Sequence, residues 1–358
     1  MGLNAEFWRG RKVFVTGHTG FKGAWLCLYL RHLGANVTGL ALPPTTNPNL
    51  FEAAGVNLRA KSIEADIRDL NALRHAMREA APDIVFHLAA QSLVRRSYDD
   101  PVETYMTNVM GTVHVLDAFR AESSARALVV VTSDKCYEEH ADGHAHSERD
   151  PLGGHDPYAA SKACAEIVSS SYRRSYFSGA EGGRAVATVR AGNVIGGGDW
   201  AQDRLLPDLV RAFAAGKPAH IRNPHATRPW QHVLDPLTGY LLLAERLVER
   251  GPAFAEAWNF GPLLDRSMTV GAIASAVARR WGESASVVVD ETPQPREAPL
   301  LALDAAKAQR RLGWMPRLST DEALAWTTSW YRDWYAKGDA GNLASAQIRR
   351  YLTVEEIA

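Results

Sequence analysis

Short apolar runs alternate with helical patterns through the first half of the chain. Five such runs end in glycine, small or polar residues and cover residues 12–16, 36–40, 62–69, 83–90 and 127–132. Amphipathic stretches follow them, as in residues 105–120. Strands that alternate with helices predict an α/β chain with a doubly wound parallel sheet. In such a sheet, ligands bind at the carboxyl ends of the strands.

The pattern changes after residue 190. A glycine-rich stretch covers residues 191–200, arginines are scattered through the next segment, and a helix is expected to run from after residue 233 to 247, followed by a strand at 258–262. We therefore expect residues 1–190 to form a dinucleotide-binding domain. Residues 191–358 are expected to form mainly a smaller substrate-binding domain, with segments interleaved with the first.

Composition excludes several classes of protein. The 358 residues are 46% hydrophobic and 22% charged, with 40 basic and 40 acidic side chains. A neutral balance argues against a nucleic-acid partner, and no apolar run reaches the 18 residues of a membrane span. Three cysteines (Cys27, Cys136 and Cys164) form no disulfide framework. Together with the lack of an apolar signal region near the first residue, this favours the cytoplasm.

A glycine turn follows the first apolar run. Gly17, Gly20 and Gly23 are spaced three residues apart between a strand and a helix. The first allows a tight turn, the second lets the backbone approach a pyrophosphate, and the third lets strand and helix pack closely. The helix N-terminus then offers unpaired N–H groups to the phosphates. Such turns also occur in structural loops, but the context favours a Rossmann dinucleotide site formed by Gly17, Thr19, Gly20, Phe21, Lys22 and Gly23.

Further cofactor candidates lie at the ends of the later strands. The second run is followed by Ala41 and has no carboxylate at its end for a ribose, so NAD and NADP are not distinguished there. Asp66 is placed either to meet an adenine amino group or to cap the next helix. Small or polar residues at the other strand ends and on the following helix complete the expected site: Ile67, Ala89, Ala90, Gln91, Asn108 and Thr132.

Two clusters of reactive side chains frame residues 131–162. Ser133, Asp134 and Lys135 are consecutive after the fifth strand, and Tyr158 precedes Lys162 by one helical turn. A phenol has a pKa of about 10. A neighbouring ammonium group and a nicotinamide charge are expected to lower that pKa, so that Tyr158 acts as a base near neutral pH.

These motifs together resemble the extended short-chain dehydrogenase/reductase family. The glycine turn, Asn108 in its N-V-x-G-T segment, and Tyr158-x-x-x-Lys162 carry the resemblance, which covers about residues 7–335. The stretches TSDKCY, VRAGNVIGGGDWAQDRLLPD and RPWQHVLDPLTGY are similar to the nucleotide-sugar 4,6-dehydratases of that family, in particular the CDP-glucose branch. The resemblance implies NAD as cofactor. It also implies a homodimer or homotetramer, with subunits paired through the helices that carry Asn108 and Tyr158.

The resemblance also implies a lyase (hydro-lyase) reaction of deoxysugar biosynthesis. CDP-D-glucose would be oxidised at C4, would lose water across C5 and C6, and would receive the hydride at C6 to give CDP-4-dehydro-6-deoxy-D-glucose. By resemblance, Tyr158 takes the C4 hydroxyl proton, Lys162 orients the ribose, and Ser133 hydrogen-bonds the C4 oxygen. Asp134 protonates the leaving C6 hydroxyl, and Lys135 removes the C5 proton.

Alternatives remain open. The dTDP-glucose branch has a glutamate where this chain has Lys135, and an amine must be neutral to act as a base. Lys135 would otherwise only pair with Asp134 or the cofactor. A dehydratase for another nucleotide sugar and a nucleotide-sugar 4-epimerase are the competing enzymes. An epimerase needs Tyr158 and Lys162 but not the Asp134–Lys135 pair, and a non-catalytic sensor should lack Tyr158 or Lys162.

Substrate contacts are expected from the arginine-rich segments. Guanidinium groups match phosphate oxygens, and the candidates for binding the diphosphate or sugar are Arg95, Asn193, Arg204, Arg222 and Arg228. Four histidines crowd one polar loop, namely His140, His144, His146 and His155. No cysteine pattern accompanies them, so no metal is expected.

Overall fold

The computed structural model describes residues 2–139, 144–178, 183–263, 268–290, 292 and 302–354. Its centre is a seven-stranded sheet with the order β11-β6-β5-β4-β1-β2-β3, in which all neighbours are parallel. The strands are β1 (Lys12–Thr16), β2 (Asn36–Ala41), β3 (Lys61–Glu64), β4 (Ile84–His87), β5 (Ala127–Val131), β6 (Ala185–Ala191) and β11 (Ala257–Phe260). The predicted doubly wound sheet is confirmed.

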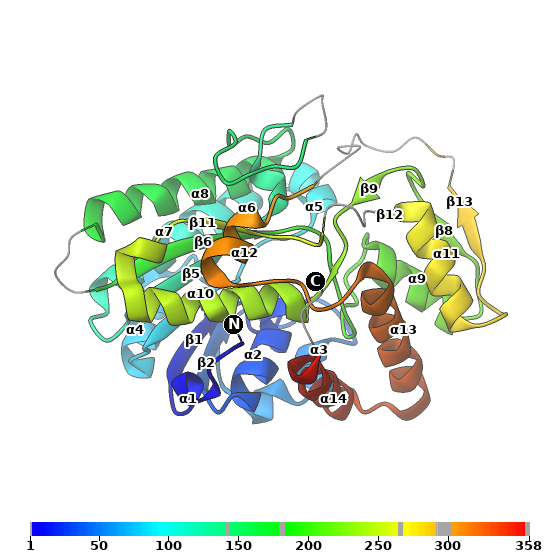
Figure 1. Cartoon of the computed structure of the whole chain (residues 1–358), viewed down its shortest axis with the longest axis horizontal. Coiled ribbons are helices and arrows are strands. Elements are labelled where there is room, and N and C mark those ends of the chain that lie inside the picture. The colour runs from blue at the N-terminus through cyan, green and yellow to red at the C-terminus, as the bar shows by residue number, and fades with distance from the viewer. Residues whose placement is uncertain are drawn as a thin grey trace.

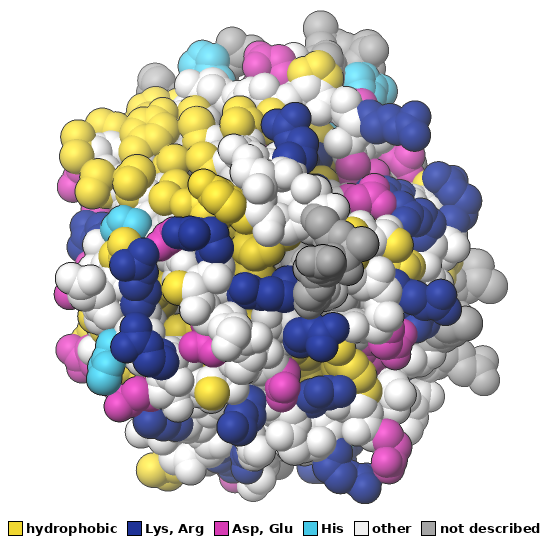
Figure 2. All heavy atoms as spheres, turned by 90° about the vertical axis from the view of Figure 1, so that its left-hand side faces the viewer, with side chains coloured by type: hydrophobic (Ala, Val, Ile, Leu, Met, Phe, Trp, Pro, Cys, Tyr) yellow, Lys and Arg dark blue, Asp and Glu magenta, His cyan; other side chains and the backbone are white. Residues whose placement is uncertain are grey.

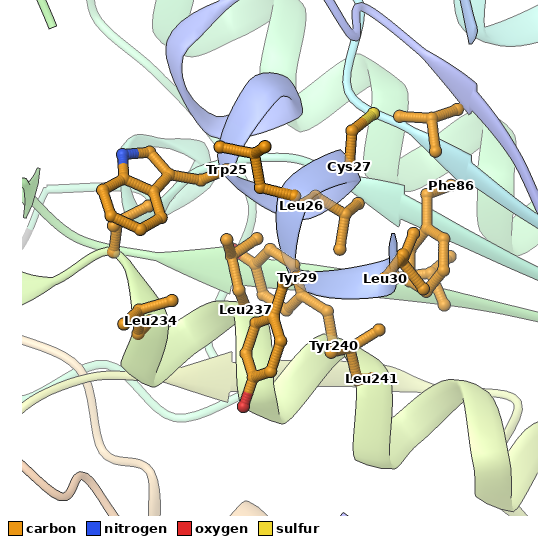
Figure 3. Close-up of a cluster of buried hydrophobic side chains, with 14 of the residues drawn as sticks. Trp25, Leu26, Cys27, Tyr29, Leu30, Phe86, Leu234, Leu237, Tyr240 and Leu241 are labelled. Atoms are coloured by element: carbon orange, nitrogen blue, oxygen red, sulfur yellow. The ribbon is translucent and has the colours of Figure 1, made fainter. Parts of the chain in front are cut away.

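Helices cover both faces of this sheet (Figure 1). Alternate residues of each buried strand point to opposite faces. Val13 and Val15 pack with α2 (Phe21–His32) and α10 (Leu234–Arg250), whereas Phe14 packs with α4 (Leu70–Ala80) and α7 (Gly111–Ala121). Figure 3 shows aromatic and aliphatic side chains of α2 and α10 meeting in the larger core. The longest helix, α8 (Pro157–Tyr176), packs beside α7.

The C-terminal half contributes to both parts of the molecule. Strand β11 pairs with β6, and α10 packs on β5 and β6, so the main sheet is completed by residues beyond 190. A separate core lies between α9 (Leu205–Ala214), α11 (Val270–Trp281) and α13 (Thr320–Lys337). The last helix, α14 (Ala340–Thr353), returns to pack on α2. The expected division at residue 190 and the interleaving of the two domains stay predictions.

Shorter elements fill the connections. The helices are α1 (Ala5–Trp8), α3 (Leu50–Ala53), α5 (Val94–Asp99), α6 (Pro101–Tyr105), a π-helical segment (Met106–Met110), α12 (Ala306–Leu312) and 3₁₀ turns at Val56–Leu58, Asp134–Cys136 and Gly251–Phe254. Paired short strands are β7 (Val194–Ile195) with β10 (Gln231–His232), β8 (Ala219–Ile221) with β13 (Val287–Val289), and β9 (Thr227–Arg228) with β12 (Met268–Thr269). Among the described helices, none combines the length and the apolarity that a bilayer crossing requires.

A buried ion pair links α8 to the sheet. Arg190 on β6 donates from Nε and Nη2 to Glu166 on α8, at 3.0 and 2.8 Å, and each side chain is only 3% exposed. Thr132 and Thr188 donate to the same carboxylate, at 2.5 and 2.7 Å. Burial alone would raise the pKa of Glu166, but Arg190 and these donors hold it below its usual value. The pair therefore fixes α8 against the ends of β5 and β6.

We expect Arg190→Met to lower the free energy of unfolding by about 3–5 kcal/mol, because it leaves a buried carboxylate without its counter-charge. Urea-induced unfolding measures this loss. Glu6→Gln is the control, because Glu6 pairs with Arg9 on the surface, where the two side chains are 79% and 73% exposed. That exposed pair is worth at most about 1 kcal/mol. Equal effects of the two substitutions would contradict the assigned role of the buried pair.

Candidate active site

The glycine turn has the close packing that the sequence predicts. Gly17 has φ +76°, and a Cβ there would lie 2.5 Å from the Ala89 nitrogen. A Cβ on Gly23 would lie 2.1 Å from the Gly17 carbonyl oxygen, so both positions exclude a side chain. Gly20 is the N-cap of α2 and has no side-chain cap. The N-terminus of α2 thus presents N–H groups without a side-chain cap, next to the closely packed backbone of the glycine turn. This arrangement fits a pyrophosphate.

Asn108 joins three parts of the predicted cofactor site. It is buried in the π-helical segment, where its Oδ1 accepts from the Gln91 backbone N–H at 2.9 Å. Its Nδ2 donates to the Gln91 carbonyl and to Ser161 Oγ, both at 2.9 Å. The loop after β4, in which Ala89 and Ala90 are half-buried, is therefore fixed to α8.

Thr19, Phe21 and Lys22, which were also predicted to bind the cofactor, lie in or next to the glycine turn. Thr19 donates to the Leu42 carbonyl, which ties the glycine turn to the end of β2. Lys22 directs its ammonium group to the Tyr240 hydroxyl at 3.5 Å, and desolvation followed by Arg204 and Lys162 lowers its pKa to about 8. Phe21 is half-buried at the start of α2.

The region after β3 settles one alternative. Asp69 is the N-cap of α4, and its side chain accepts from the Asn71 and Ala72 N–H groups. Asp66 instead accepts from the Arg68 guanidinium at 2.8 and 2.6 Å, so it is not the helix cap. Ile67 belongs to the core and lies against Gly111, whose added Cβ would come within 2.4 Å of it.

The two reactive clusters meet at the carboxyl end of β5. Tyr158 is the second residue of α8, which starts at Pro157 and is capped by Asp156. The Ser133 hydroxyl donates to Asp134 Oδ1 at 3.0 Å, and both residues lie close enough to the Tyr158 hydroxyl to act on its pKa. Lys162, one turn after Tyr158, donates to the Val131 carbonyl at 3.2 Å. The structure thus brings together Ser133, Asp134, Tyr158 and Lys162.

The pKa of Tyr158 differs from the expectation. Burial raises it to about 12, a hydrogen bond from Ser133 opposes this rise, Asp134 reinforces it, and Arg204 is the opposing cation. The pKa of Lys162 itself falls to about 8, chiefly through burial. The value for Tyr158 is that of the chain without a nicotinamide charge, so the expected lowering of the Tyr158 pKa by Lys162 together with bound NAD stays a prediction.

Asp134 has the properties of a general acid. Burial raises the pKa of its carboxyl group, and the opposing influences in decreasing order are Lys135, the Ser133 hydrogen bond, Arg228 and Lys22. Only 4% of the residue is exposed. Lys135 is half-buried in the same turn, and its charge acts on Asp134. A carboxyl group that tends to stay protonated can donate a proton to a leaving hydroxyl.

The predicted substrate arginines converge on residues 199–204. Arg204 donates to Asp199 Oδ2 at 3.0 Å and to Ser92 Oγ at 3.1 Å. Arg222 donates to Asp203 Oδ1 at 2.9 Å, and Arg95 lies 3.7 Å from that same oxygen.

Two other substrate candidates flank the short strands. Arg228 is buried on β9 and lies close enough to Asp134 to lower the pKa of that carboxyl. Asn193 is half-buried, and its carbonyl accepts from the Gln231 N–H at 3.0 Å. Arg228 thus lies near Asp134, whereas the Asn193 backbone contacts β10.

Three residues of the histidine-rich loop form a cluster. Ligand atoms of His144, His146 and Asp150 all lie within 4.8 Å of one another. Asp150 accepts from His144 at 2.9 Å and from Ser147 Oγ at 2.8 Å, so hydrogen bonds to the Asp150 carboxylate hold this part of the loop together. His155 is exposed, and His140 lies outside the described residues. The absence of a metal stays a prediction.

Sequence reasoning missed the supporting residues behind the site. Glu166 and Arg190 position α8, and Arg190 also donates to the Tyr137 hydroxyl at 2.6 Å. Tyr137 in turn donates to Asn259 on β11 at 2.7 Å. A signal was present for Glu166, because it follows Tyr158 and Lys162 at successive four-residue steps on one helix face.

The fold and site define a dinucleotide enzyme of the short-chain dehydrogenase/reductase class, with the triplet Ser133, Asp134 and Lys135 near the tyrosine. The sequence matches the family described as GDP-mannose 4,6 dehydratase over residues 14–327. The chain belongs to this family of extended short-chain dehydrogenases/reductases.

Individual relatives resemble the chain over almost its whole length. A CDP-glucose 4,6-dehydratase from Salmonella typhimurium is 47% identical over 98% of this chain and 99% of its own. A dTDP-glucose 4,6-dehydratase from Streptomyces griseus is 30% identical over 90% of this chain and 95% of its own.

Solved structures of two activities share the fold. A dTDP-glucose 4,6-dehydratase double mutant from Streptomyces venezuelae, with NAD bound, has a TM-score of 0.76 and 27% identity over 90% of this chain and 97% of its own. A UDP-glucose 4-epimerase from Thermus thermophilus in complex with NAD has a TM-score of 0.77 and 26% identity over 89% and 98%. The fold therefore does not separate dehydratases from epimerases.

We expect Gly23→Ala to destabilise the chain by about 1–3 kcal/mol and to weaken NAD binding, because the methyl group overlaps the Gly17 backbone. Gly20→Ala is the matched control. Its methyl group would meet the Gly17 oxygen at an ordinary 3.5 Å, so stability should change by less than about 0.5 kcal/mol. The second substitution should weaken only NAD binding. Urea unfolding and equilibrium dialysis with NAD test both, and a Gly23→Ala chain of native stability would contradict the close contact.

Proposed function

We propose that the chain is an NAD-dependent dehydratase that converts CDP-D-glucose to CDP-4-dehydro-6-deoxy-D-glucose. One observation carries the proposal: Ser133 donates to the carboxyl group of Asp134, with Lys135 beside it, and both Ser133 and Asp134 lie close enough to Tyr158 to act on its pKa. Oxidation at C4 needs the tyrosine, and loss of water needs an acid and a base. The 47% identity to a CDP-glucose 4,6-dehydratase supports the choice of substrate.

The glycine cradle fits NAD as the cofactor. The open N-terminus of α2 at Gly20 would hold the pyrophosphate, and the residues around Ala89, Asn108 and Lys162 would hold the nicotinamide half. When bound, NAD accepts a hydride from C4 of the sugar and returns it to C6. Asp66 and Thr132 are proposed at the edges of the same site, with Asp66 toward the adenosine end.

Protons are moved by the chain's own side chains. Tyr158, as the phenolate, takes the C4 hydroxyl proton, and the hydroxyl group of Ser133 stabilises the C4 oxygen. The C4 ketone acidifies C5–H, so Lys135 as a neutral amine takes that proton and returns it to C5 when the hydride reaches C6. Asp134 then protonates the leaving C6 hydroxyl, which departs as water. Lys162 orients the cofactor and lies one helical turn from the phenol.

The diphosphate of the substrate is proposed to bind the arginine cluster around residues 199–204. Arg95 and Arg222 share Asp203, and Arg204 is held by Asp199 and Ser92, so three guanidinium groups are positioned before substrate arrives. Fixed guanidinium groups bind phosphate oxygens at a reduced entropic cost. Arg228 and Asn193 are proposed to contact the sugar or diphosphate on the opposite flank.

Incubation with CDP-, dTDP-, GDP- and UDP-glucose tests the proposal, because mass spectrometry detects the loss of one water from the sugar. We expect that loss with CDP-glucose. Lys135→Met should block elimination and leave 4-keto-glucose and reduced cofactor, with product formation slowed about 10²- to 10⁴-fold. Tyr158→Phe is the comparison, because it should prevent even C4 oxidation while NAD stays bound. An epimerised sugar of unchanged mass would show that the chain is an epimerase.

The helices beside the site present an apolar surface that we propose pairs two copies of the chain. Exposed large apolar side chains lie on α5, α6, the π-helical segment and α8, namely Tyr98, Val102, Tyr105, Met106, Met110, Ile167 and Tyr176. Figure 2 shows hydrophobic side chains gathered on the face that carries α8. Contiguous exposed apolar side chains of this kind mark interaction sites. We therefore propose a homodimer, or a homotetramer built from two such dimers.

We expect Ile167→Asp to shift the chain toward monomer, because burying one isoleucine is worth about 1.5–3 kcal/mol. The dimer dissociation constant should rise roughly tenfold or more. Leu58→Asp is the control, since Leu58 is 86% exposed on a 3₁₀ turn outside the proposed surface. Sedimentation velocity measures both variants, and a monomeric parent chain or an unchanged Ile167→Asp dimer would contradict the pairing.

We also propose that the chain works in the cytoplasm without a nucleic-acid partner. Its cysteines are all free thiols, two of them buried, and its formal charge is zero. Free thiols are typical of a reducing compartment. The proposed functional division assigns residues 1–190 to the cofactor and residues 191–358 mainly to the substrate.

A further inference from the structure

Asp203 brings together arginines from two distant segments of the chain. Its Oδ1 accepts from Arg222 Nη1 at 2.9 Å and lies 3.7 Å from Arg95 Nε. Arg95 is on α5, shortly after β4, whereas Arg222 follows β8 in the C-terminal half. Guanidinium groups bind phosphate oxygens in the same way as carboxylate oxygens. Asp203 therefore has the contacts that the diphosphate is expected to make in the arginine cluster.

The two acidic residues of this cluster are held differently. The side chain of Asp199 is 8% exposed and accepts from Arg204, which also donates to Ser92, so Arg204 is fixed from two sides. The side chain of Asp203 is 42% exposed, and those of its two arginine partners are 38% and 27% exposed. Exposed ion pairs are weak, because water and salt screen them. Displacing the Asp203 carboxylate therefore costs little, whereas displacing the buried Asp199 leaves a guanidinium group without its partner.

The backbone of Asp203 has an uncommon conformation. Its φ is +58°, in the left-handed region. Aspartate tolerates this region better than most side chains do, but the conformation remains less favourable than the right-handed one. Such conformations are concentrated at active sites, ligand clamps and switch regions. The ion pairs with the two arginines help to hold Asp203 in this conformation, so its backbone can relax when they take another partner.

The charges of the cluster also favour an exchange. The three guanidinium groups of Arg95, Arg204 and Arg222 and the two carboxylates of Asp199 and Asp203 leave the cluster one positive charge. Removal of the Asp203 carboxylate leaves two positive charges. The diphosphate of a nucleotide sugar carries a negative charge on each phosphate, so its charge is matched only after Asp203 has left.

We propose that the substrate's diphosphate competes with Asp203 for Arg95 and Arg222 and takes its place on these two arginines. This inference rests on the proposed function, because it requires the arginine cluster to bind the diphosphate. The product keeps the same diphosphate, so the returning carboxylate also promotes release of the product. Asp203 thus selects ligands whose negative charge is sufficient to displace it.

Binding of CDP and of cytidine to the NAD-loaded chain tests the exchange by isothermal titration calorimetry, with cytidine measured through its displacement of CDP. We expect Asp203→Asn to bind CDP roughly 3- to 30-fold more tightly, because the amide has no charge with which to compete for the arginines. Cytidine has no phosphate, so its affinity should not change. Asp203→Gly is a second variant, since glycine adopts a positive φ without strain, and it should also bind CDP more tightly.

Asp208→Asn is the matched control. Asp208 lies on α9, a short distance along the chain, and its carboxylate accepts from Arg211 in an ion pair outside the arginine cluster. This substitution removes the same charge, but the affinity for CDP should change by less than about twofold.

Three results would overturn the exchange. Unchanged affinity for CDP in both Asp203 variants would show that the carboxylate does not compete, and weaker binding would show that it only holds the arginines in place. Equal tightening by Asp208→Asn would show an effect of overall charge. Absence of CDP binding by the unmodified chain would instead contradict the proposed substrate, and the exchange would fail with it.

Discussion

The buried contact between Glu166 and Arg190 is the constraint on which the active site depends. Tyr158 and Lys162 lie on α8, whereas Ser133 and Asp134 follow β5, so their meeting requires helix and sheet to be held in one register. The carboxylate of Glu166 does this by accepting from Thr132 after β5 and from Thr188 and Arg190 on β6. A buried ion pair of this kind is stable only when its hydrogen bonds are complete. The Glu166–Arg190 pair thus sets the distances between the reactive groups, although neither residue takes part in the proposed reaction.

Charge is unevenly distributed around the reacting groups. Asp134 is the carboxylate of the triplet, and the ammonium or guanidinium groups of Lys22, Lys135 and Arg228 all act on its pKa. Burial works against those cations and favours the neutral acid. The same burial makes the phenolate of Tyr158 costly in the chain alone. Burial therefore shifts both oxygen acids, Asp134 and Tyr158, toward their neutral protonated forms, and nearby cations limit that shift.

Sequence reasoning located the local features well. The glycine spacing, the five early strands and the Tyr158–Lys162 turn each follow from a few neighbouring residues, because buried parallel strands are continuous apolar runs and helical spacing fixes a face. The Glu166–Arg190 pair, the sharing of Asp203 by two arginines and the direction of Lys22 were not predictable in this way. Each depends on contacts between distant segments, and those contacts are set by strand order and packing.

Strand β11 has a consequence for how the protein is made. Residues 257–260 form the outer strand beside β6, so β6 remains an open edge until that part of the chain has left the ribosome. An unpaired edge strand invites association with other chains, and β6 carries Arg190, the cation of the buried pair. During synthesis the nascent chain must therefore protect an incomplete sheet for some 65 residues beyond β6. A nascent chain whose synthesis pauses between β6 and β11 would therefore have the greatest need of chaperones.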